Sequence, residues 1–287
     1  MTQRVKLPRT GSLLHSLPAM LAFPHINPVL IAIGPFAIRW YGAMFLVAFA
    51  GAYWLARRRA SRPGSTWSLV DIDNLVFYGA VGAILGGRLG WVLFYGLEYV
   101  LVDPWRALRV WEGGMSFHGG LTGVILALIL FARRNHRRIG DVFDFAVPLP
   151  AVGLFSVRVA NFINGELWGK PTSVPWAFVY NGVPRHASQL YEAILEGLVL
   201  GTVLWVFTAR PRPRLAPSGL FLLGYGLIRF AIEFVRVPDD NRGYLLLGWV
   251  TEGQLLSAPM IAAGIVLLAL AYQRAIPSGN VVVAVSQ

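Results

Sequence analysis

Long apolar runs separated by short arginine clusters dominate this sequence. Of its 287 residues, 56% are hydrophobic and 14% are charged, and the mean hydropathy is +0.58. A soluble protein carries about 25% charged residues. The deficit indicates an integral membrane protein, and the length suits one bundle of several spanning helices rather than a string of domains.

The apolar runs predict an all-α polytopic membrane protein with about seven transmembrane helices. Residues 1–27 are expected to form an amino-terminal interfacial segment, because their apolar patch is interrupted and no clear small-residue cleavage site follows it. Residues 28–275 are expected to form a single transmembrane helical domain with periplasmic connections, and residues 276–287 a cytoplasmic tail. The expected spans are roughly Ile31–Ala56, Leu75–Leu97, His118–Ala132, Phe143–Phe162, Leu190–Ala209, Ser218–Val235 and Leu247–Tyr272.

The basic residues indicate how the chain is oriented. The net charge is +11, and the connections after the first, third, fifth and seventh spans hold 12 Lys/Arg, whereas those after the second, fourth and sixth hold 5; the main clusters are Arg57–Arg62, Arg133–Arg138 and Arg210–Arg214. Connections rich in basic residues stay in the cytoplasm, which predicts a periplasmic N-terminus and a cytoplasmic C-terminus. Short basic clusters between apolar runs fit anionic lipid headgroups, so no nucleic-acid partner is expected.

One stretch places polar side chains inside this apolar chain. Residues 158–169 are R-V-A-N-F-I-N-G-E-L-W-G, with Arg158, Asn161, Asn164 and Glu166 close together. A charged group is costly in hydrocarbon, and such residues usually mark a functional site. The predicted orientation places this stretch at the outer end of the fourth span.

Three further predicted spans place polar residues in the same outer half of the bilayer. His118 lies in G-G-M-S-F-H-G-G at the start of the third span, and Tyr41 follows Arg39 and Trp40 near the start of the first. The sixth span has polar residues at helical spacing on one face, and two of them, an arginine and a glutamate four residues apart, can pair. These four residues are Tyr225, Arg229, Glu233 and Arg236.

Each of these residues also has a purely structural interpretation. The Arg229–Glu233 pair could hold helices together, and His118 could be an interfacial histidine. Gly86, Gly87 and Gly90 are typical of close helix packing, whereas Arg88 among them is a charge within a span.

Arginines in a cavity open to lipid suit a phosphate diester, because guanidinium makes bidentate, permanently charged contacts. The residues alone fit either a lipid-handling enzyme or an anion transporter. Transporters often carry internal repeats, and none is visible in this sequence. A structural scaffold would not need the intramembrane charges.

The stretch R-V-A-N-F-I-N-G-E-L-W-G closely resembles the signature of the prolipoprotein diacylglyceryl transferases of bacterial inner membranes. Two departures are Val157, where the family usually has glycine, and Ala187, where it usually has proline; neither removes a polar group. The other matching blocks are R-W-Y-G (Arg39–Gly42), G-G-R-L-G-W-V-L-F-Y (Gly86–Tyr95), G-G-M-S-F-H-G-G (Gly113–Gly120), R-H-A-S-Q-L-Y-E (Arg185–Glu192) and Y-G-L-I-R-F-A-I-E-F-V-R-V-P-D (Tyr225–Asp239).

The resemblance implies a multi-pass enzyme of the bacterial inner membrane with its active site towards the periplasm. Such an enzyme transfers the sn-1,2-diacylglyceryl group of phosphatidylglycerol to the lipobox cysteine of a preprolipoprotein. The product is a thioether, glycerol phosphate leaves, and the step is the first in bacterial lipoprotein maturation. The family uses no metal or organic cofactor. The chain has no cysteine, which is compatible because the required thiol belongs to the substrate.

The resemblance also implies roles for individual residues. Arg158 and Arg229 would hold the phosphate and stabilise charge on the leaving glycerol phosphate. His118 would be the candidate base for the thiol, although Arg229 remains an alternative activating group. The remaining candidates are substrate-binding: Asn161 and Glu166 for headgroup or backbone, Glu233 to orient Arg229, and Tyr41 and Tyr225 as headgroup contacts.

Overall fold

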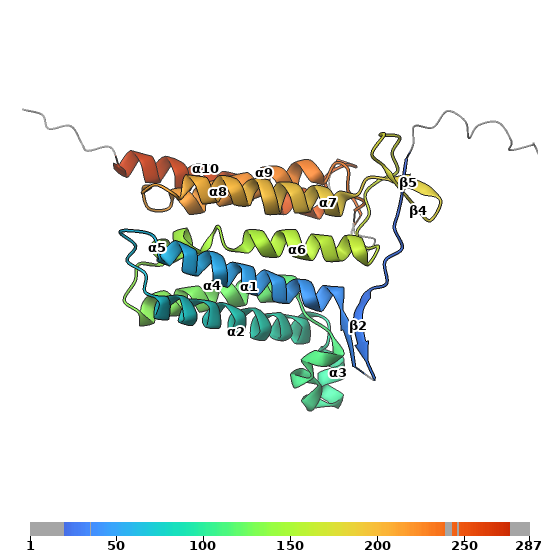
Figure 1. The fold of residues 1–287 in the computed structure, drawn as a ribbon, viewed down its shortest axis with the longest axis horizontal. Helices are drawn as coiled ribbons and strands as arrows, with labels where there is room; N and C mark the ends of the chain where they lie inside the picture. The colour runs from blue at the N-terminus through green and yellow to red at the C-terminus, as the bar shows by residue number, and fades with distance from the viewer. Residues whose placement is uncertain (1–19, 35, 239–242, 246, 276–287) are drawn as a thin grey trace, which may run out of the picture.

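The structure is a computed structural model that describes residues 20–34, 36–238, 243–245 and 247–275. Most of these residues are helical, and the helices run side by side along the long axis of the molecule (Figure 1). The short strands and the lobe around α3 lie at one end of the bundle, and the ends of α1 and α4 that carry arginine clusters lie at the other. Residues 1–19, the larger part of the predicted amino-terminal segment 1–27, and residues 276–287, the predicted cytoplasmic tail, lie outside the described residues.

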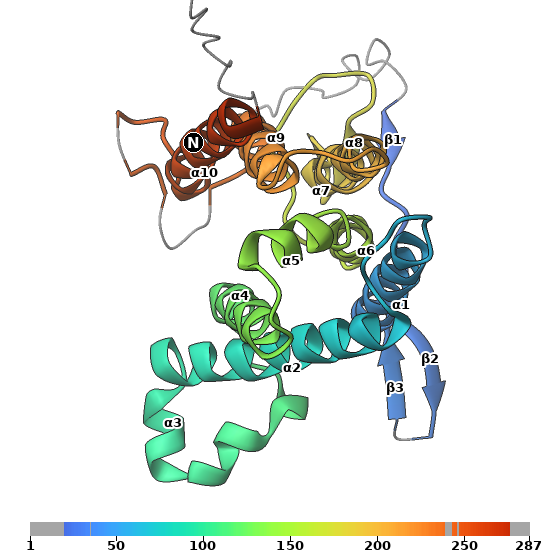
Figure 2. The ribbon, with the colours of Figure 1, turned by 90° about the vertical axis from the view of Figure 1, so that its left-hand side faces the viewer.

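The helices form two groups with α6 between them (Figure 2). On one side α2 packs on α4 and α1 packs on α6, and on the other α9 packs on α10, while α6 also contacts the segment that follows α7. This arrangement places α6, which carries Arg158, against both halves of the molecule.

The first predicted span begins too early. Residues 29–39 form an antiparallel hairpin of β2 (Val29–Ile33) and β3 (Phe36–Arg39), and α1 covers Trp40–Ala60. Gly34 takes a left-handed φ of +57° at the turn, a conformation that glycine adopts readily. Val29–Ile33 is as apolar as a membrane-spanning helix, and its β-branched residues favour a strand. Hydropathy alone therefore could not show where the hairpin ends and the spanning helix begins.

Helix α2 (Leu69–Phe94) begins six residues before the predicted Leu75. The Ser68 side chain accepts from the Asp71 N–H, and the Asp71 carboxylate accepts from the Ser68 N–H, which forms a capping box. The chain then passes through a lobe of short helices and enters α4 (Phe117–Arg134), close to the predicted third span. The lobe consists of α3 (Leu97–Val102), η1 (Pro104–Leu108) and η2 (Val110–Glu112).

Glycines set the close approach of α2 and α4. A Cβ added at Gly86 would lie 2.4 Å from the Gly119 carbonyl oxygen, and one added at Gly90 would lie 2.8 Å from the Gly119 Cα. Real side chains essentially never come this close, so only glycine allows the two backbones to touch. The predicted packing role of Gly86 and Gly90 is confirmed.

The predicted fourth span, Phe143–Phe162, is broken. It forms α5 (Ile139–Ala146) and α6 (Pro150–Ile163), which are bent by 45° relative to each other. Pro148 and Pro150 lack the N–H that would continue the helical bonding, so the bend falls at these prolines.

The second half of the chain begins with a composite helix. Residues 188–207 form α7 (Ser188–Glu192), a π-helical turn labelled η3 (Ala193–Val199) and α8 (Leu200–Phe207), which covers most of the predicted fifth span. Helix α9 (Ala216–Ile232) follows it. Helix α10 (Glu252–Ala275) begins five residues after the predicted Leu247, because Leu247 and Gly248 have φ values of +51° and +72° and cannot belong to a helix.

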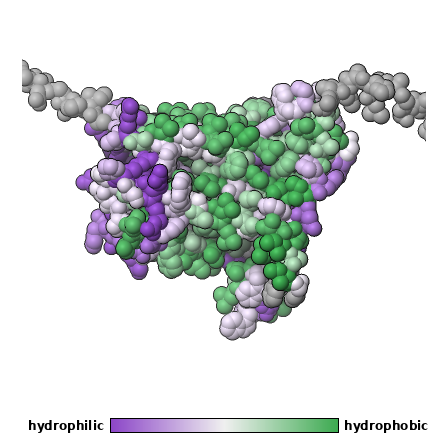
Figure 3. Space-filling view, viewed as in Figure 1, coloured by the Kyte–Doolittle hydropathy of each residue, from purple (hydrophilic) through white to green (hydrophobic). Residues whose placement is uncertain are grey.

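The structure supports a multi-pass membrane protein. Within the described part of the chain, four helices are long and apolar enough to cross a membrane, or five if the bent pair α5–α6 is one span, and α9 is a shorter apolar helix. Hydrophobic side chains cover the middle of the visible face, and hydrophilic ones gather at the end with the arginine clusters (Figure 3). The count of seven spans and the orientation of the termini stay predictions.

The mostly helical structure is consistent with the predicted all-α class, and a small sheet lies beside the bundle. β1 (Leu21–Ala22) pairs in parallel with β4 (Phe178–Tyr180), which pairs with β5 (Val183–Arg185) in a hairpin. Beside it Phe23, Trp168 and Ala187 form a buried cluster, and Trp168 is only 7% exposed. Trp168, the tryptophan of the signature stretch, is therefore a packing residue of this cluster.

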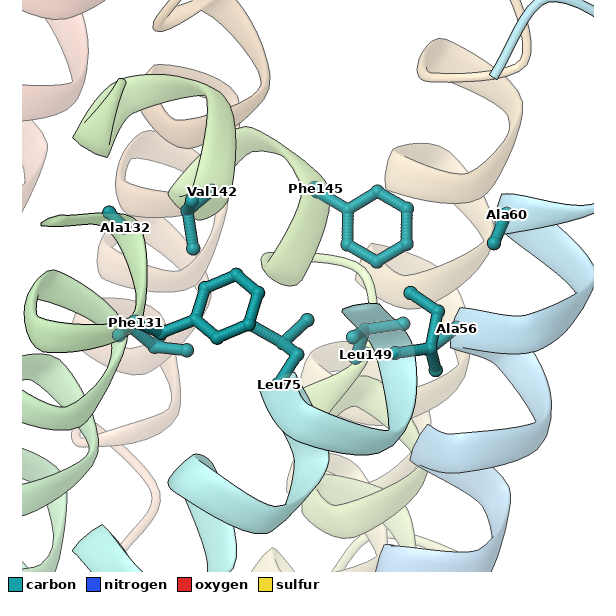
Figure 4. Packing of buried hydrophobic residues seen from close by; sticks show 10 residues of the cluster. Ala56, Ala60, Leu75, Phe131, Ala132, Val142, Phe145 and Leu149 are labelled. Atoms are coloured by element: carbon teal, nitrogen blue, oxygen red, sulfur yellow. The ribbon is translucent and has the colours of Figure 1, made fainter. Parts of the chain in front are cut away.

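The largest buried apolar cluster lies towards the arginine-rich end. Side chains from α1, α2, α4 and α5 meet there, with the fully buried Phe131 at the centre (Figure 4). This core fixes the first half of the bundle at the end away from the strands, and it leaves the polar residues of α6 at the strand end.

Candidate active site

Arg158 and Glu192 join two helices in the interior of the bundle. Arg158 lies near the end of α6, and its Nε is 2.5 Å from the Glu192 Oε2 on α7. The Arg158 side chain is 19% exposed and the Glu192 side chain 2%. Glu192 is thus one of the most buried charged residues of the protein and forms an ion pair with a residue of the sequence signature.

Arg229 on α9 binds the same carboxylate. Its Nη1 donates to Glu192 Oε1 at 2.8 Å, and its Nη2 lies 2.6 Å from Glu233 Oε1. The expected Arg229–Glu233 pair is confirmed. Glu192 therefore orients arginines from two different helices, and each arginine approaches a different oxygen of its carboxylate.

Arg236 and Thr251 complete the arrangement. Arg236 Nη1 donates to Glu233 Oε1 at 3.1 Å, and the Thr251 hydroxyl donates to Glu233 Oε2 at 2.7 Å. We call the five charged residues Arg158, Glu192, Arg229, Glu233 and Arg236 the ion-pair network. Its three guanidinium groups and two carboxylates leave one net positive charge, which suits a monoanion.

The sequence interpretation did not assign Glu192 to the site. Glu192 ends the block R-H-A-S-Q-L-Y-E, and an acidic residue inside the apolar stretch 188–207 is a signal of the same kind as Arg158.

The signature turn after α6 holds Glu166 at the edge of the site. The Asn161 Nδ2 donates to Glu166 Oε2 at 3.0 Å, and the Asn164 Nδ2 donates to Oε1 at 3.2 Å. The turn is shaped by Gly165, with φ of +70°, and by the Gln189 side chain, which donates to the Glu166 carbonyl. Asn161 is buried, whereas Glu166 is exposed. The two amides therefore orient a carboxylate that remains accessible.

The two tyrosines face this region from opposite sides. Tyr41 on α1 lies near Asn161, and the charges of Glu166 and Arg158 act on it. Tyr225 on α9 is within the electrostatic reach of Arg229, Arg158 and Glu192. The structure thus brings together seven of the eight predicted site residues.

His118 is the eighth and lies apart from the network. It is the second residue of α4, its side chain is exposed, and its ring makes an edge contact with Phe117. Among the described residues, no hydrogen bond or ion pair links the His118 ring to the network.

Arg88, the charge between the packing glycines, has a structural role. It is 5% exposed, and its Nε donates to the Ala107 carbonyl at 2.9 Å while its Nη1 donates to the Gly114 carbonyl at 2.9 Å. Its guanidinium also donates to the carbonyls of Arg106 and Gly113 and lies over the Trp91 ring. Arg88 therefore holds the lobe onto α2, immediately before the helix that carries His118.

An apolar cavity of about 410 Å³ lies beside the network, between η3, the end of α9 and the connection that precedes α7. His186 borders it, and burial holds the pKa of His186 below its usual value; its Nδ1 lies 3.1 Å from the Tyr191 hydroxyl. Tyr191 directly precedes Glu192, so the cavity and the network share one helix. The lining residues are Trp176, His186, Tyr191, Leu195, Ala231, Ile232 and Val235.

Fold and site together define an integral membrane protein that can hold an anion, next to an apolar cavity, at one end of its helical bundle. The model of the family described as prolipoprotein diacylglyceryl transferase matches residues 28–270. The chain belongs to this family.

Named relatives agree over nearly the whole chain. The phosphatidylglycerol--prolipoprotein diacylglyceryl transferase of Ectopseudomonas mendocina is 53% identical over 259 residues, which cover 89% of this chain and 97% of the relative. Proteins with the same name from Pseudomonas putida and Azotobacter vinelandii are 51% and 52% identical, and each alignment covers 89% of this chain and 97% or 98% of the relative. The family and the relatives therefore identify a transferase.

Proposed function

We propose that this protein transfers the sn-1,2-diacylglyceryl group of phosphatidylglycerol to the lipobox cysteine of a preprolipoprotein, with glycerol phosphate as the leaving group. Family membership and the names of relatives about 52% identical support this activity. The ion-pair network supports it independently, because the single negative charge of a phosphate diester matches the one net positive charge of the network.

The observation that carries the proposal is the pairing of Arg158 and Arg229 across Glu192. Arg158 pairs with Glu192 through its Nε. Within the part of the chain that the structure describes, its Nη1 and Nη2 form no hydrogen bond or ion pair. Two terminal guanidinium nitrogens can donate to a phosphate in parallel. Arg229 stays bound to Glu192 and Glu233 and adds positive charge at a fixed place.

The reaction is a substitution at the carbon of the diacylglyceryl group that is bonded to the phosphate oxygen. The cysteine sulfur attacks this carbon, the S–C bond forms, the C–O bond breaks, and the electron pair leaves with the phosphate oxygen. The phosphate changes from a monoanion to a dianion, so fixed guanidinium charges stabilise the transition state more than the ground state. His118 takes the proton of the thiol, whose unperturbed pKa of about 8.5 is within reach of an imidazole.

The remaining residues position the lipid. Glu166, held by Asn161, accepts hydrogen bonds from the hydroxyls of the glycerol headgroup, and the Tyr41 and Tyr225 phenols bind the headgroup or phosphate oxygens. Glu233 orients Arg229. The apolar cavity of about 410 Å³ offers space for hydrocarbon beside the charged site.

We place the enzyme in the bacterial inner membrane with seven spans and its active site towards the periplasm. The network lies near the end of the bundle that carries the strands, away from the arginine clusters (Figure 1). Arginine-rich connections mark the cytoplasmic side, so this arrangement supports a periplasmic site.

The test mixes the purified protein with phosphatidylglycerol vesicles and a lipobox peptide, and mass spectrometry reads the peptide. We expect a diacylglyceryl mass gain on the cysteine and release of glycerol phosphate. Folded protein that gives no gain, with a peptide that a related transferase accepts, would overturn the proposal.

Variants of the arginines test the phosphate site itself. Arg158→Ala and Arg229→Ala should each lower transfer by about 100-fold or more, the loss typical of removing a donor aimed at developing charge. Arg214→Ala is the matched control, since Arg214 pairs with Asp141 outside the network. Turnover of both network variants near the control value would exclude the phosphate-binding role.

A further inference from the structure

Glu196 is fully buried and has no polar partner. Its exposed fraction is 0%, and among the described residues neither carboxyl oxygen accepts or donates a hydrogen bond. It lies on the π-helical turn one helical turn after Glu192, so the two carboxyl groups share one face of the composite helix. Helical turns of this kind are rare and occur often at functional sites.

Charges from three elements surround Glu196. Glu192 on α7 repels a negative charge there, whereas Arg158 on α6 and Arg229 on α9 attract it. Arg236, just after α9, attracts it as well, and Tyr225 on α9 is an uncharged neighbour. Yet no ion pair joins any of these arginines to Glu196 in the described part of the chain, and both of its carboxyl oxygens lack a hydrogen-bond partner there.

An ionised carboxylate without a donor is strongly disfavoured in a dry interior, and a second carboxylate nearby adds to the cost. The neutral acid avoids both costs. Inside a membrane the argument is stronger still, because water cannot reach the group.

We propose that Glu196 is a neutral carboxylic acid when phosphatidylglycerol binds, and that its proton sets the charge that the network presents to the phosphate. This inference rests on the proposed phosphate site. With Glu196 neutral, the network keeps one net positive charge and matches a phosphate monoanion. With Glu196 ionised, that charge is cancelled and a third carboxylate repels the lipid.

Glu196 is in this scheme a positioning residue, since it acts through the network and transfers no proton to the substrate. Phosphate binding and Glu196 protonation are thermodynamically linked: each favours the other by the same factor. The lipid therefore binds well at a pH where Glu196 holds its proton, and less well above it.

The experiment measures the affinity of the full-length protein for short-chain phosphatidylglycerol from about pH 6 to about pH 9, a range in which buried carboxyl groups lose protons. No peptide is present, so the thiol contributes nothing. In the wild type the dissociation constant should rise with pH and approach about tenfold per pH unit, the limit for one linked proton. In Glu196→Gln, a neutral isostere, it should stay flat; Glu98→Gln, at an exposed site on α3, should follow the wild type.

A flat wild-type profile, or a Glu196→Gln profile that rises like the wild type, overturns the inference. If Glu196→Gln does not fold, calorimetry of the wild type in two buffers of different ionisation enthalpy decides: uptake of a proton on lipid binding supports the inference, and its absence overturns it. Failure of the phosphate site looks different, because Arg158→Ala would then bind the lipid as tightly as the wild type at every pH.

Discussion

Arg229 Nη1 lies 2.8 Å from Glu192 Oε1, so α9 and α7 are joined by a charged pair in the interior of the bundle. The partner of the second Glu192 oxygen is Arg158, from a third helix. One carboxylate therefore fixes the separation of the two arginines. In the proposed phosphate site this separation sets where the phosphate binds, so the proposal gives Glu192 a role beside the two arginines.

Replacement of Glu192 by glutamine is the first prediction. The substitution removes the carboxylate that Arg158 pairs with and one of the two that Arg229 pairs with, so we expect stability to fall by about 3–5 kcal/mol and transfer by about 100-fold or more. Thermal unfolding in detergent and the peptide assay measure the two effects. Asp141→Asn is the control, because the Asp141–Arg214 pair is 45% exposed on both sides and such pairs contribute about 0–1 kcal/mol. Equal losses in both variants would contradict the role of Glu192.

The second prediction concerns the glycine contact between α2 and α4. Gly123→Ala should destabilise the protein by about 1–3 kcal/mol, because the new Cβ would lie 2.0 Å from the Gly82 carbonyl oxygen and the helices would have to separate. Gly79→Ala on α2 meets nothing within 4 Å and should be neutral or stabilising by up to about 1 kcal/mol. The pair is compared by thermal unfolding, and a Gly123→Ala protein as stable as Gly79→Ala would mean that the helices do not touch there.

The third prediction tests how Arg88 holds the lobe. Arg88→Ala should lower the free energy of unfolding by about 2–4 kcal/mol. Each hydrogen bond from a charged donor contributes about 1.5–3 kcal/mol, and water can bind some of the carbonyls that Arg88 leaves. Arg88→Lys should recover little of this stability, because an ammonium group lacks the planar guanidinium fork that reaches the carbonyls of Ala107 and Gly114 together. Proteolysis of the segment 97–114 in the folded protein is a local readout; unchanged cleavage rates in both variants would argue against the contact.

Much of this architecture could be predicted from the sequence. Hydropathy indicated most of the long helices, and the cost of charge in hydrocarbon pointed to Arg158, Arg229 and Glu233, which the structure brings together in the ion-pair network. Local rules could also have found the early start of α2, since Ser68 and Asp71 form a capping-box pattern. They could likewise have found the break in the fourth span at Pro148.

Two features were beyond those rules. The β2–β3 hairpin is as apolar as a span, so its structure depends on the turn at Gly34 rather than on hydropathy. The central place of Glu192 depends on which helices pack side by side: only the packing of α6 and α9 around α7 brings Arg158 and Arg229 to one carboxylate. No local pattern contains that information.

The fourth prediction is a pH dependence of stability that comes from His186. Burial lowers the pKa of His186 in the folded protein, so the unfolded chain binds a proton more readily and stability falls as the pH drops below about 6.5. The melting temperature should therefore fall more between about pH 7.5 and about pH 5.5 in the wild type than in His186→Gln. His118→Gln, at an exposed site, should retain the wild-type slope, and identical slopes in all three proteins would exclude His186 as the cause.

The fifth prediction separates binding from chemistry at His118. Its side chain is exposed and bonded to none of the network residues that the structure describes, so His118→Gln should leave the melting temperature and the affinity for short-chain phosphatidylglycerol unchanged. Transfer at pH 7 should fall by about 100-fold or more, the typical contribution of a general base. As the pH approaches about 9 the thiol ionises without help, and the deficit should shrink. A deficit that stays constant with pH, or a weaker lipid affinity, would show that His118 binds the lipid and does not activate the thiol.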